Sequence, residues 1–208
     1  MSGNPKVSIV IPSKLSLFKN CASYRETKFI CAIESCLLQT FTDFEIIILG
    51  DNCDITERIY KDRYSTNSKI HFTQCVCKGL TWNRVSLLRN HGILKAKGEY
   101  ITYLDTDDVL GKNHLQIIVD GLKQYDWIWY DDYIAGKDLT GRLNRCELKF
   151  GNIGTSNVTH KKNLGVKWED GTYKHDFRFI NELMKFPNYT KAATPEYFIC
   201  HQPEKFDV

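Results

Sequence analysis

The sequence has no long hydrophobic run. Near the N-terminus, the apolar stretch from Val7 to Ile11 is only five residues long, which is too short for the core of a signal peptide or for a membrane span. No later run approaches membrane-spanning length. We therefore expect a soluble, cytoplasmic protein without a transmembrane segment.

The excess of positive over negative residues is also small, and closely spaced cysteines are few. The net charge of +3 is too small to indicate a nucleic-acid partner by itself. Eight cysteines are present, but Cys75 and Cys77 have no second close pair that would complete a tetrahedral zinc site. We interpret the cysteines as reduced, small hydrophobic residues.

Internal repeats and low-complexity linkers are absent, and 208 residues suffice for one well-buried domain. Hydrophobic periodicity alternates between strand and helix patterns. The predicted strands are 7–11, 44–49, 70–76, 100–104 and 127–130, and the predicted helices are 24–39, 55–64, 83–95, 115–122 and 177–185. From about residue 131 the pattern changes, with a turn over 136–141, strand-like residues around that turn and over 145–150, and a polar, irregular stretch over 154–160. We expect this second half to add another wall to the first sheet.

Continuous apolar strands that alternate with amphipathic helices predict an α/β fold with a mostly parallel sheet covered on both faces. In such sheets, ligands bind outside the carboxyl ends of the strands. Three polar segments follow predicted strands directly: Pro12–Ser13, Gly50–Asn52 and Asp105–Asp108. We therefore expect these segments to converge on one rim of the sheet.

The third of these segments is unusually acidic. The predicted strand that ends at Leu104 runs straight into Asp105, Thr106, Asp107 and Asp108. Neighbouring carboxylates repel each other, so a folded chain tolerates them best beside a positive charge. Two interpretations remain open at this point: a site for a divalent cation, or a solvated turn that caps the following helix.

Three stretches in order carry a family resemblance: VSIVIPSK, AIESCLLQTFTDFEIIILGDN and LLRNHGILKAKGEYITYLDTDD. Together they resemble the nucleotide-sugar glycosyltransferases with the GT-A fold, in particular family 2, over residues 5–125 and weakly to residue 201. The resemblance implies one GT-A domain over 1–208, with a nucleotide-sugar half at 1–125 and a smaller acceptor half at 126–208. It also implies metal-dependent sugar transfer, with inversion, from a nucleotide sugar to a glycan, glycolipid or other hydroxyl acceptor. A UDP-sugar is the favoured donor.

The acidic segment falls where that family places its DxD motif. Asp107 matches the metal-binding aspartate, and Asp105 matches the first aspartate, which lies near the ribose and reaches the metal through water. Mn²⁺ or Mg²⁺ would take carboxylate and phosphate oxygens there and neutralise the leaving diphosphate. Asp108 is a weaker candidate, and a cap for a helix from Lys112 is its alternative role. The resemblance adds His201 as a further metal contact.

The resemblance also assigns the nucleotide site. Asp51 matches an aspartate that accepts a hydrogen bond from the uracil ring, which suits a group that only accepts. Arg89 lies where relatives carry a basic residue close to the phosphates. The remaining lining residues of the base pocket would be Pro12, Ser13 and Asn52.

This sequence departs from the family pattern beside that pocket. Gly50 stands where many relatives have another aspartate, and Ser13-Lys14 stands where many have threonine and tyrosine. The contacts to the base are therefore expected to differ, and uridine specificity is less secure than the metal site.

Relatives place the catalytic base in a Glu-Asp pair that opens a helix. Such a base must reach the attacking hydroxyl as an oxocarbenium-like state forms. His175-Asp176 resembles this segment best, whereas Glu169-Asp170 is a literal pair with Gly171 directly after it. Asp176 is preferred and Asp170 is the alternative, although aspartate at a helix start is also an ordinary cap. Of the pair Asp131-Asp132, we expect one carboxylate to face the acceptor cleft.

Other classes of protein fit less well. A haloacid-dehalogenase-type phosphatase needs its DxD on the first strand, but here about a hundred residues precede Asp105. A nucleotidyltransferase usually has a glycine-rich loop after the first strand, and 12–18 contains no glycine. A binding-only domain without catalysis stays open. Among acceptors, a base in DNA is a weaker alternative, suggested only by Lys161, Lys162 and Lys167.

Overall fold

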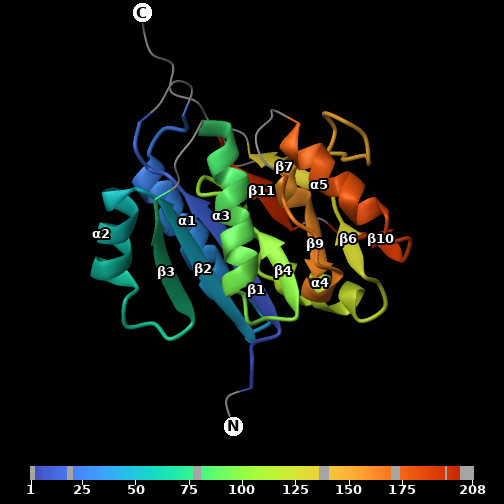
Figure 1. Ribbon diagram of the computed structural model, residues 1–208, viewed down its shortest axis with the longest axis horizontal. Coiled ribbons are helices and arrows are strands. Elements are labelled where there is room, and N and C mark those ends of the chain that lie inside the picture. The colour runs from blue at the N-terminus through green and yellow to red at the C-terminus, as the bar shows by residue number, and fades with distance from the viewer. Residues whose placement is uncertain are drawn as a thin grey trace, which may run out of the picture.

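A seven-stranded sheet forms the centre of the protein, with the strand order β10-β6-β9-β4-β1-β2-β3 (Figure 1). This computed structural model describes residues 3–17, 21–76, 81–135, 141–169, 174–194 and 196–201, with the side chains of 81–83 left out. The strands of this sheet are β1 (Val7–Ser13), β2 (Phe44–Asp51), β3 (Ile70–Cys75), β4 (Tyr100–Tyr103), β6 (Trp127–Trp129), β9 (Val158–Lys161) and β10 (Tyr189–Lys191).

A second, four-stranded sheet has the order β5-β11-β7-β8. Its strands are β5 (Val109–Leu110), β7 (Asp132–Ala135), β8 (Gly141–Asn144) and β11 (Tyr197–Ile199). The helices are α1 (Arg25–Leu37), α2 (Asp54–Arg63), α3 (Thr81–Lys95), α4 (His114–Leu122) and α5 (His175–Met184), with short 3-10 turns η1 (Thr155–Asn157) and η2 (Lys162–Leu164). No helix in the described ranges is long and apolar enough to cross a bilayer.

The central sheet is mixed but mostly parallel, as predicted. β1 pairs in parallel with β2 and β4, while β9 runs antiparallel to both β4 and β6. The register pairs Ser13 with Gly50 and Val10 with Tyr103. The carboxyl ends of β1, β2 and β4 therefore lie at one edge of the sheet, and the three polar segments that follow them share that edge.

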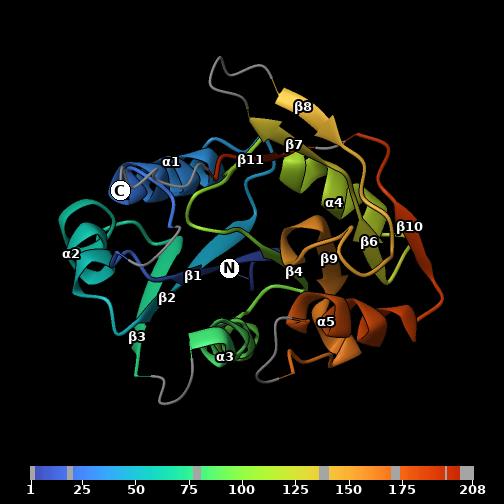
Figure 2. The ribbon, with the colours of Figure 1, turned by 90° about the horizontal axis from the view of Figure 1, so that it is seen from above.

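Alternating residues of β1 divide the core into two layers. Ile9 and Ile11 pack with residues of α1, α2 and α4 on one face, whereas Val10 packs with residues of α3 and α5 on the other. Figure 2 shows this arrangement from above, with the sheet between the two sets of helices. The approach of α3 is close: a Cβ on Gly92 would lie 2.4 Å from Cγ1 of Val10.

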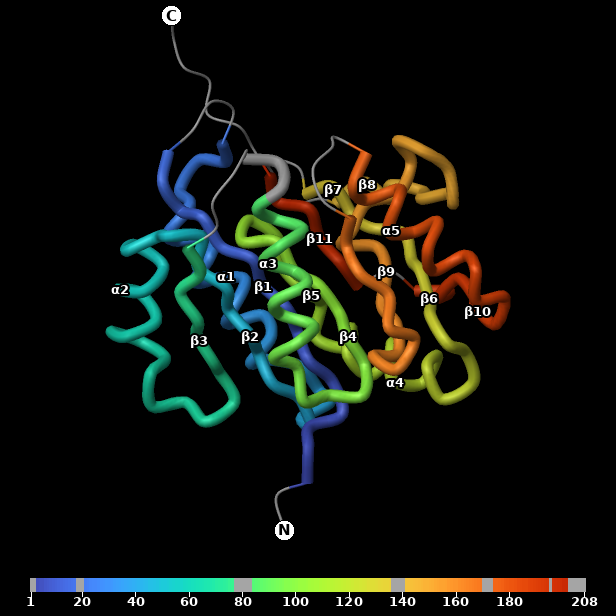
Figure 3. Tube along the Cα trace, viewed as in Figure 1, coloured from blue at the N-terminus to red at the C-terminus, as the bar shows by residue number. Residues whose placement is uncertain are grey.

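The prediction of an irregular stretch over 154–160 was wrong for residues 158–160, whereas 154–157 form a loop and the short turn η1. Residues 154–160 include β9, which lies inside the sheet and beneath α5 (Figure 3). Its polar side chains are buried because they find partners there: Thr159 Oγ1 donates to Thr102 Oγ1 at 3.0 Å, and His160 Nε2 lies 2.9 Å from the Tyr103 hydroxyl. Burial lowers the pKa of His160 to about 4, so this imidazole stays neutral.

The segment 145–150 and the cysteines were also subjects of prediction. The strand-like residues expected around 136–141 form β7 and β8, whereas 145–150 contain bends and a turn instead of a strand. Residues 136–140 of the expected turn lie outside the described residues. The cysteines in the described part of the chain form no disulfide, and their reduced state stays a prediction. Cys77 lies outside the described residues.

Candidate active site

A buried carboxylate lies at the carboxyl end of β2. Asp51 is the last residue of that strand, and its Oδ1 has no hydrogen-bond partner among the described residues. Its Oδ2 lies 3.7 Å from Lys14 Nζ and 3.6 Å from Arg84 Nη1. An unsatisfied buried acceptor is costly. Asp51 is therefore placed to accept a hydrogen bond from a ligand N–H group.

The other residues expected around a base lie beside Asp51. Pro12 and Ser13 end β1, in register with Leu49 and Gly50, and the Ser13 hydroxyl lies 2.8 Å from that of Thr56 on α2. Asn52 has a left-handed backbone, with φ 45°, and its N–H donates to the carbonyl of Cys75. The structure brings these four expected residues together on adjacent strand ends.

The glycine that departs from the family pattern has a local physical reason. A Cβ on Gly50 would lie 2.3 Å from Gln74 Oε1 and 3.0 Å from Cε2 of Phe72. The Gln74 side chain of β3 therefore fills the space that an aspartate at position 50 would need.

The acidic segment Asp105–Asp108 follows β4, next to the end of β1. Its members have different partners: Asp105 Oδ1 accepts a hydrogen bond from Arg89 Nη2 at 3.1 Å, and Asp107 Oδ2 lies 2.6 Å from His201 Nδ1. Thr106 and Asp107 do form a turn, and the side chains of Asp105 and Asp107 are partly exposed. The turn is nevertheless tied to the rest of the fold, because both carboxylates have side-chain partners.

Asp108 anchors the C-terminal strand of the second sheet. Its carboxylate accepts hydrogen bonds from the Tyr197 hydroxyl at 2.9 Å and from the Cys200 N–H at 2.8 Å. Burial, together with the charges of Asp105 and Asp107, raises the pKa of Asp108 well above its usual range. The capping alternative for Asp108 was wrong, because α4 begins only at His114 after the N-cap Asn113. The anchor instead holds the chain that carries His201.

Asp107 and His201 offer a fitting pair of ligands for a divalent cation. Their oxygen and nitrogen already point at each other at 2.6 Å. In the described ranges no group of three or more His, Cys, Asp or Glu side chains is arranged to hold a metal. Mg²⁺ in particular binds through one or two carboxylates plus substrate phosphates and water, a role that Asp107 can fill. The residues present therefore fit a cation that a diphosphate helps to hold.

The preferred base, Asp176, lies in the first turn of α5. Its Oδ1 accepts a hydrogen bond from the Thr155 hydroxyl and lies 3.1 Å from His175 Nε2 and 3.5 Å from Arg89 Nη1. Partial burial by itself would raise the pKa of Asp176, but the hydrogen bond from His175 and the charge of Arg89 outweigh it and lower the pKa. Asp176 is therefore ionised at neutral pH, as a general base must be.

Arg89 joins the acidic segment to the preferred base. It lies on α3, is 4% exposed, and its guanidinium stacks 4.7 Å from the ring of Trp168. One nitrogen contacts Asp105 and another contacts Asp176. Both contacts run to carboxylates, so a role beside phosphates stays a prediction for this residue.

The alternative base, Asp170, lies outside the described residues. Its neighbour Glu169 is exposed and forms an ion pair with Arg178 at 3.2 Å. Thr155 is a contact of the candidate base that the sequence did not reveal, whereas His175 was already named as the neighbour of Asp176 in the pair. The polar run from 154 to 157 was the available signal, but its spatial partner on α5 was not readable.

A pocket of about 600 Å³ opens beside Asp176. Its lining residues come from the start of α5, from residues 144–157, and from Asp132 and Ile199. Asp132 is buried and accepts a hydrogen bond from Asn157 Nδ2 at 2.7 Å, whereas Asp131 pairs with Lys191 at 2.6 Å. Of this pair of aspartates, Asp132 is the one that lines the pocket.

Known proteins share this fold. S. aureus TarS 1–349 in complex with UDP-GlcNAc superimposes with a TM-score of 0.70 and 14% identity, over 96% of this chain and 60% of that one. The same protein in complex with UDP gives 0.67 and 15%, over 93% and 60%. At this identity the likeness shows the fold alone, which is the GT-A fold of nucleotide-sugar glycosyltransferases.

Sequence comparison identifies the family. The family described as Glycosyl transferase family 2 matches residues 19–188, and the chain belongs to it. Chondroitin synthase of Escherichia coli is 31% identical over 121 residues, which make up 58% of this chain and 16% of that protein. GalNAc(5)-diNAcBac-PP-undecaprenol beta-1,3-glucosyltransferase of Campylobacter jejuni is 30% identical over 109 residues, 51% of this chain and 31% of that protein. The chain thus spans less than a third of these curated relatives.

Proposed function

We propose that this chain transfers a sugar from a nucleotide sugar, with a UDP-sugar as the favoured donor, to the hydroxyl of a glycan, glycolipid or similar acceptor. One observation carries the proposal: Arg89 contacts both Asp105 and Asp176. The acidic segment beside the expected donor site and the preferred base beside the pocket therefore lie within one side chain of each other. A direct transfer needs the donor and the acceptor held side by side, and this proximity supports it.

The donor side of the site binds the nucleotide sugar. Asp51 Oδ1, buried and without a partner in the described part of the chain, accepts the ring N–H of uracil, and Lys14 and Arg84 balance its charge. Asp107 and His201 would hold Mn²⁺ or Mg²⁺, with Asp105 near the ribose. When bound, the cation neutralises the charge of the departing diphosphate. The TarS structures with UDP and UDP-GlcNAc support this choice of donor.

The acceptor side of the site contains the proposed catalytic base. The acceptor occupies the pocket beside Asp176, which removes the proton from the attacking hydroxyl as the new glycosidic bond forms. The bond between the anomeric carbon and the diphosphate breaks on the opposite side, so the configuration inverts. Thr155 and His175 hold the Asp176 carboxylate in place.

The first test is calorimetric titration of UDP, GDP, CDP and dTDP into the protein, with and without Mn²⁺. We expect metal-dependent binding of UDP that Asp107→Ala abolishes. If none of the nucleotides binds, the transferase assignment is wrong. If another nucleotide binds instead, the donor assignment is wrong.

The second test separates binding from transfer. Asp176→Asn keeps the size of the side chain but removes the base, so we expect UDP binding to persist and transfer to fall by roughly a hundredfold or more, the usual contribution of a general base. Asp170→Asn serves as the matched comparison and should keep its transfer rate. Loss of transfer only in Asp170→Asn would move the base to that residue. Nucleotide binding without transfer in the unaltered protein would indicate a binding-only domain.

A further inference from the structure

Two exposed cations line the pocket beside Asp176. Arg145 follows β8, and Lys174 directly precedes α5, so the two approach the pocket from different segments. Neither forms an ion pair with any side chain in the described ranges. By contrast, Lys149 on the same segment as Arg145 is paired with Glu147 at 2.7 Å and does not line the pocket.

The acidic residues that line the pocket are already balanced or buried. The Asp176 carboxylate has Arg89 and His175 beside it. Asp132 Oδ2 is held by Asn157 Nδ2 and by the thiol of Cys146 at 3.7 Å, and its Oδ1 has no hydrogen-bond partner among the described residues, but the residue is only 1% exposed and so does not face a ligand. The uncompensated charge that a ligand meets in this pocket is therefore positive.

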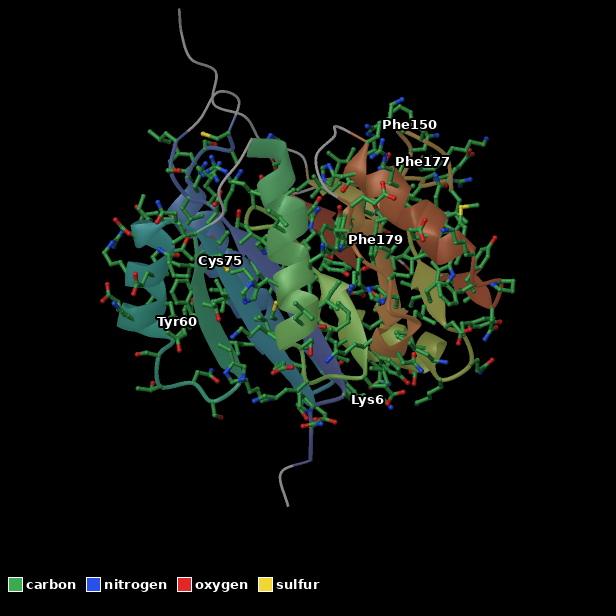
Figure 4. All side chains as sticks on the ribbon, in the orientation of Figure 1. Lys6, Tyr60, Cys75, Phe150, Phe177 and Phe179 are labelled. Carbon is green, nitrogen blue, oxygen red and sulfur yellow. The ribbon has the colours of Figure 1, made fainter. Side chains whose placement is uncertain are left out.

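An aromatic surface lies next to these cations. Phe150 is 50% exposed, its ring centroid lies 5.8 Å from that of Phe177, and Lys174 Nζ lies 5.3 Å from the Phe150 centroid. Figure 4 shows Phe150 close to Phe177 of α5, with Lys6 far from both, at the amino end of β1. An aromatic face takes the apolar face of a sugar ring, and a neighbouring cation takes an acidic substituent on that ring.

We propose that the acceptor is a sugar unit that carries a negatively charged group, a carboxylate or a phosphate, which Arg145 and Lys174 bind. The sugar ring lies against Phe150, and its reactive hydroxyl faces Asp176. The guanidinium of Arg145 suits either group. A carboxylate is planar and a phosphate is tetrahedral, but each presents two oxygens that accept parallel hydrogen bonds from a guanidinium. This inference rests on the proposed transferase function and adds the chemical class of the second substrate.

The test measures binding of matched sugars by ligand-observed NMR, with the protein saturated with UDP and Mg²⁺ so that the donor site is filled. Methyl β-glucuronide is compared with methyl β-glucoside, and glucose 6-phosphate with glucose. The variants are Arg145→Gln and Lys174→Gln, and Lys149→Gln is the control on the same segment. A parallel UDP titration checks that each variant keeps its donor site.

We expect at least one acid-bearing sugar to bind about tenfold tighter than its neutral partner, the order of one charge-assisted hydrogen bond. Arg145→Gln and Lys174→Gln should each remove most of this difference and leave the neutral sugar unchanged, and added salt should weaken it. The carboxylate pair and the phosphate pair identify which group is recognised.

Several outcomes would overturn the inference. It is wrong if neither acid-bearing sugar binds tighter than its neutral partner, or if Lys149→Gln lowers the affinity as much as the pocket variants do. In both cases intact UDP binding would leave the proposed function standing. Failure of UDP to bind the unaltered protein would instead refute the proposed function itself.

Discussion

Replacing Arg89 tests whether burial or distance governs the strength of an ion pair here. Arg89 is 4% exposed and lies 3.1 Å from Asp105 and 3.5 Å from Asp176. Arg58 forms a shorter pair with Glu26, at 2.7 Å, but its side chain is 56% exposed. Distance alone would make the Arg58 pair the stronger one, whereas burial predicts the opposite.

The magnitude follows from the surroundings of each arginine. Removing one partner of a buried pair costs about 3–5 kcal/mol, but the carboxylates of Asp105 and Asp176 are 40% and 36% exposed, so water replaces part of the lost charge. The stacking on Trp168 adds about 0.5–2 kcal/mol. We expect Arg89→Ala to lower the free energy of unfolding by about 2–4 kcal/mol, and Arg58→Ala by at most about 1 kcal/mol.

Urea denaturation of both variants measures these two free energies, and a common slope would show that the comparison is sound. Arg89→Lys keeps the charge but loses the planar fork that reaches two carboxylates, so it should recover stability only in part. If Arg89→Ala and Arg58→Ala destabilise the protein equally, the bridging role inferred from the geometry is wrong.

Three further predictions concern Asp176, Gly92 and Gly50. The folded protein lowers the pKa of Asp176. Its contribution to stability is therefore complete above the unfolded-state pKa of about 4 and is lost as pH falls through the folded-state pKa. The transfer rate should fall on the acid side below about pH 4, and Asp176→Asn should lack this acid limb. Gly92→Ala places a Cβ 2.4 Å from Val10 and should destabilise the protein by about 1–3 kcal/mol in urea, whereas no loss would mean that α3 shifts freely on β1. Gly50→Asp should lose about 1–2 kcal/mol against the Gln74 side chain, and Gln74→Ala in the same chain should restore most of it; an unaffected single variant would contradict the steric account.

Short-range patterns in the sequence determined the central sheet and the helices that cover it. The apolar run of β2 and the helical spacing of α4 are short-range patterns, and continuous apolar strands between helices imply a parallel sheet. Once the sheet is parallel, its strand ends must share an edge, so the convergence of Ser13, Asp51 and Asp105 followed from the order of residues alone. Their chemical roles remain predictions.

The stretch that contains β9 escaped this reasoning because its polarity suggested exposure. Thr159 and His160 are buried only because Thr102 and Tyr103 on the neighbouring strand supply hydrogen bonds. Such compensation depends on which strands become neighbours, and no local propensity encodes it.

The tertiary structure alone decided how the candidate site is connected. Asp107 meets His201 across 94 residues of sequence, Asp108 anchors Tyr197 across 89, and Arg89 reaches a carboxylate on α5 as well as one beside β4. The residue types at each position were readable in advance, because a strand end or a helix start has a recognisable local pattern. Which of them touch was decided by the packing of α3 and α5 on one face of the sheet, because burial of distant apolar surfaces sets these contacts.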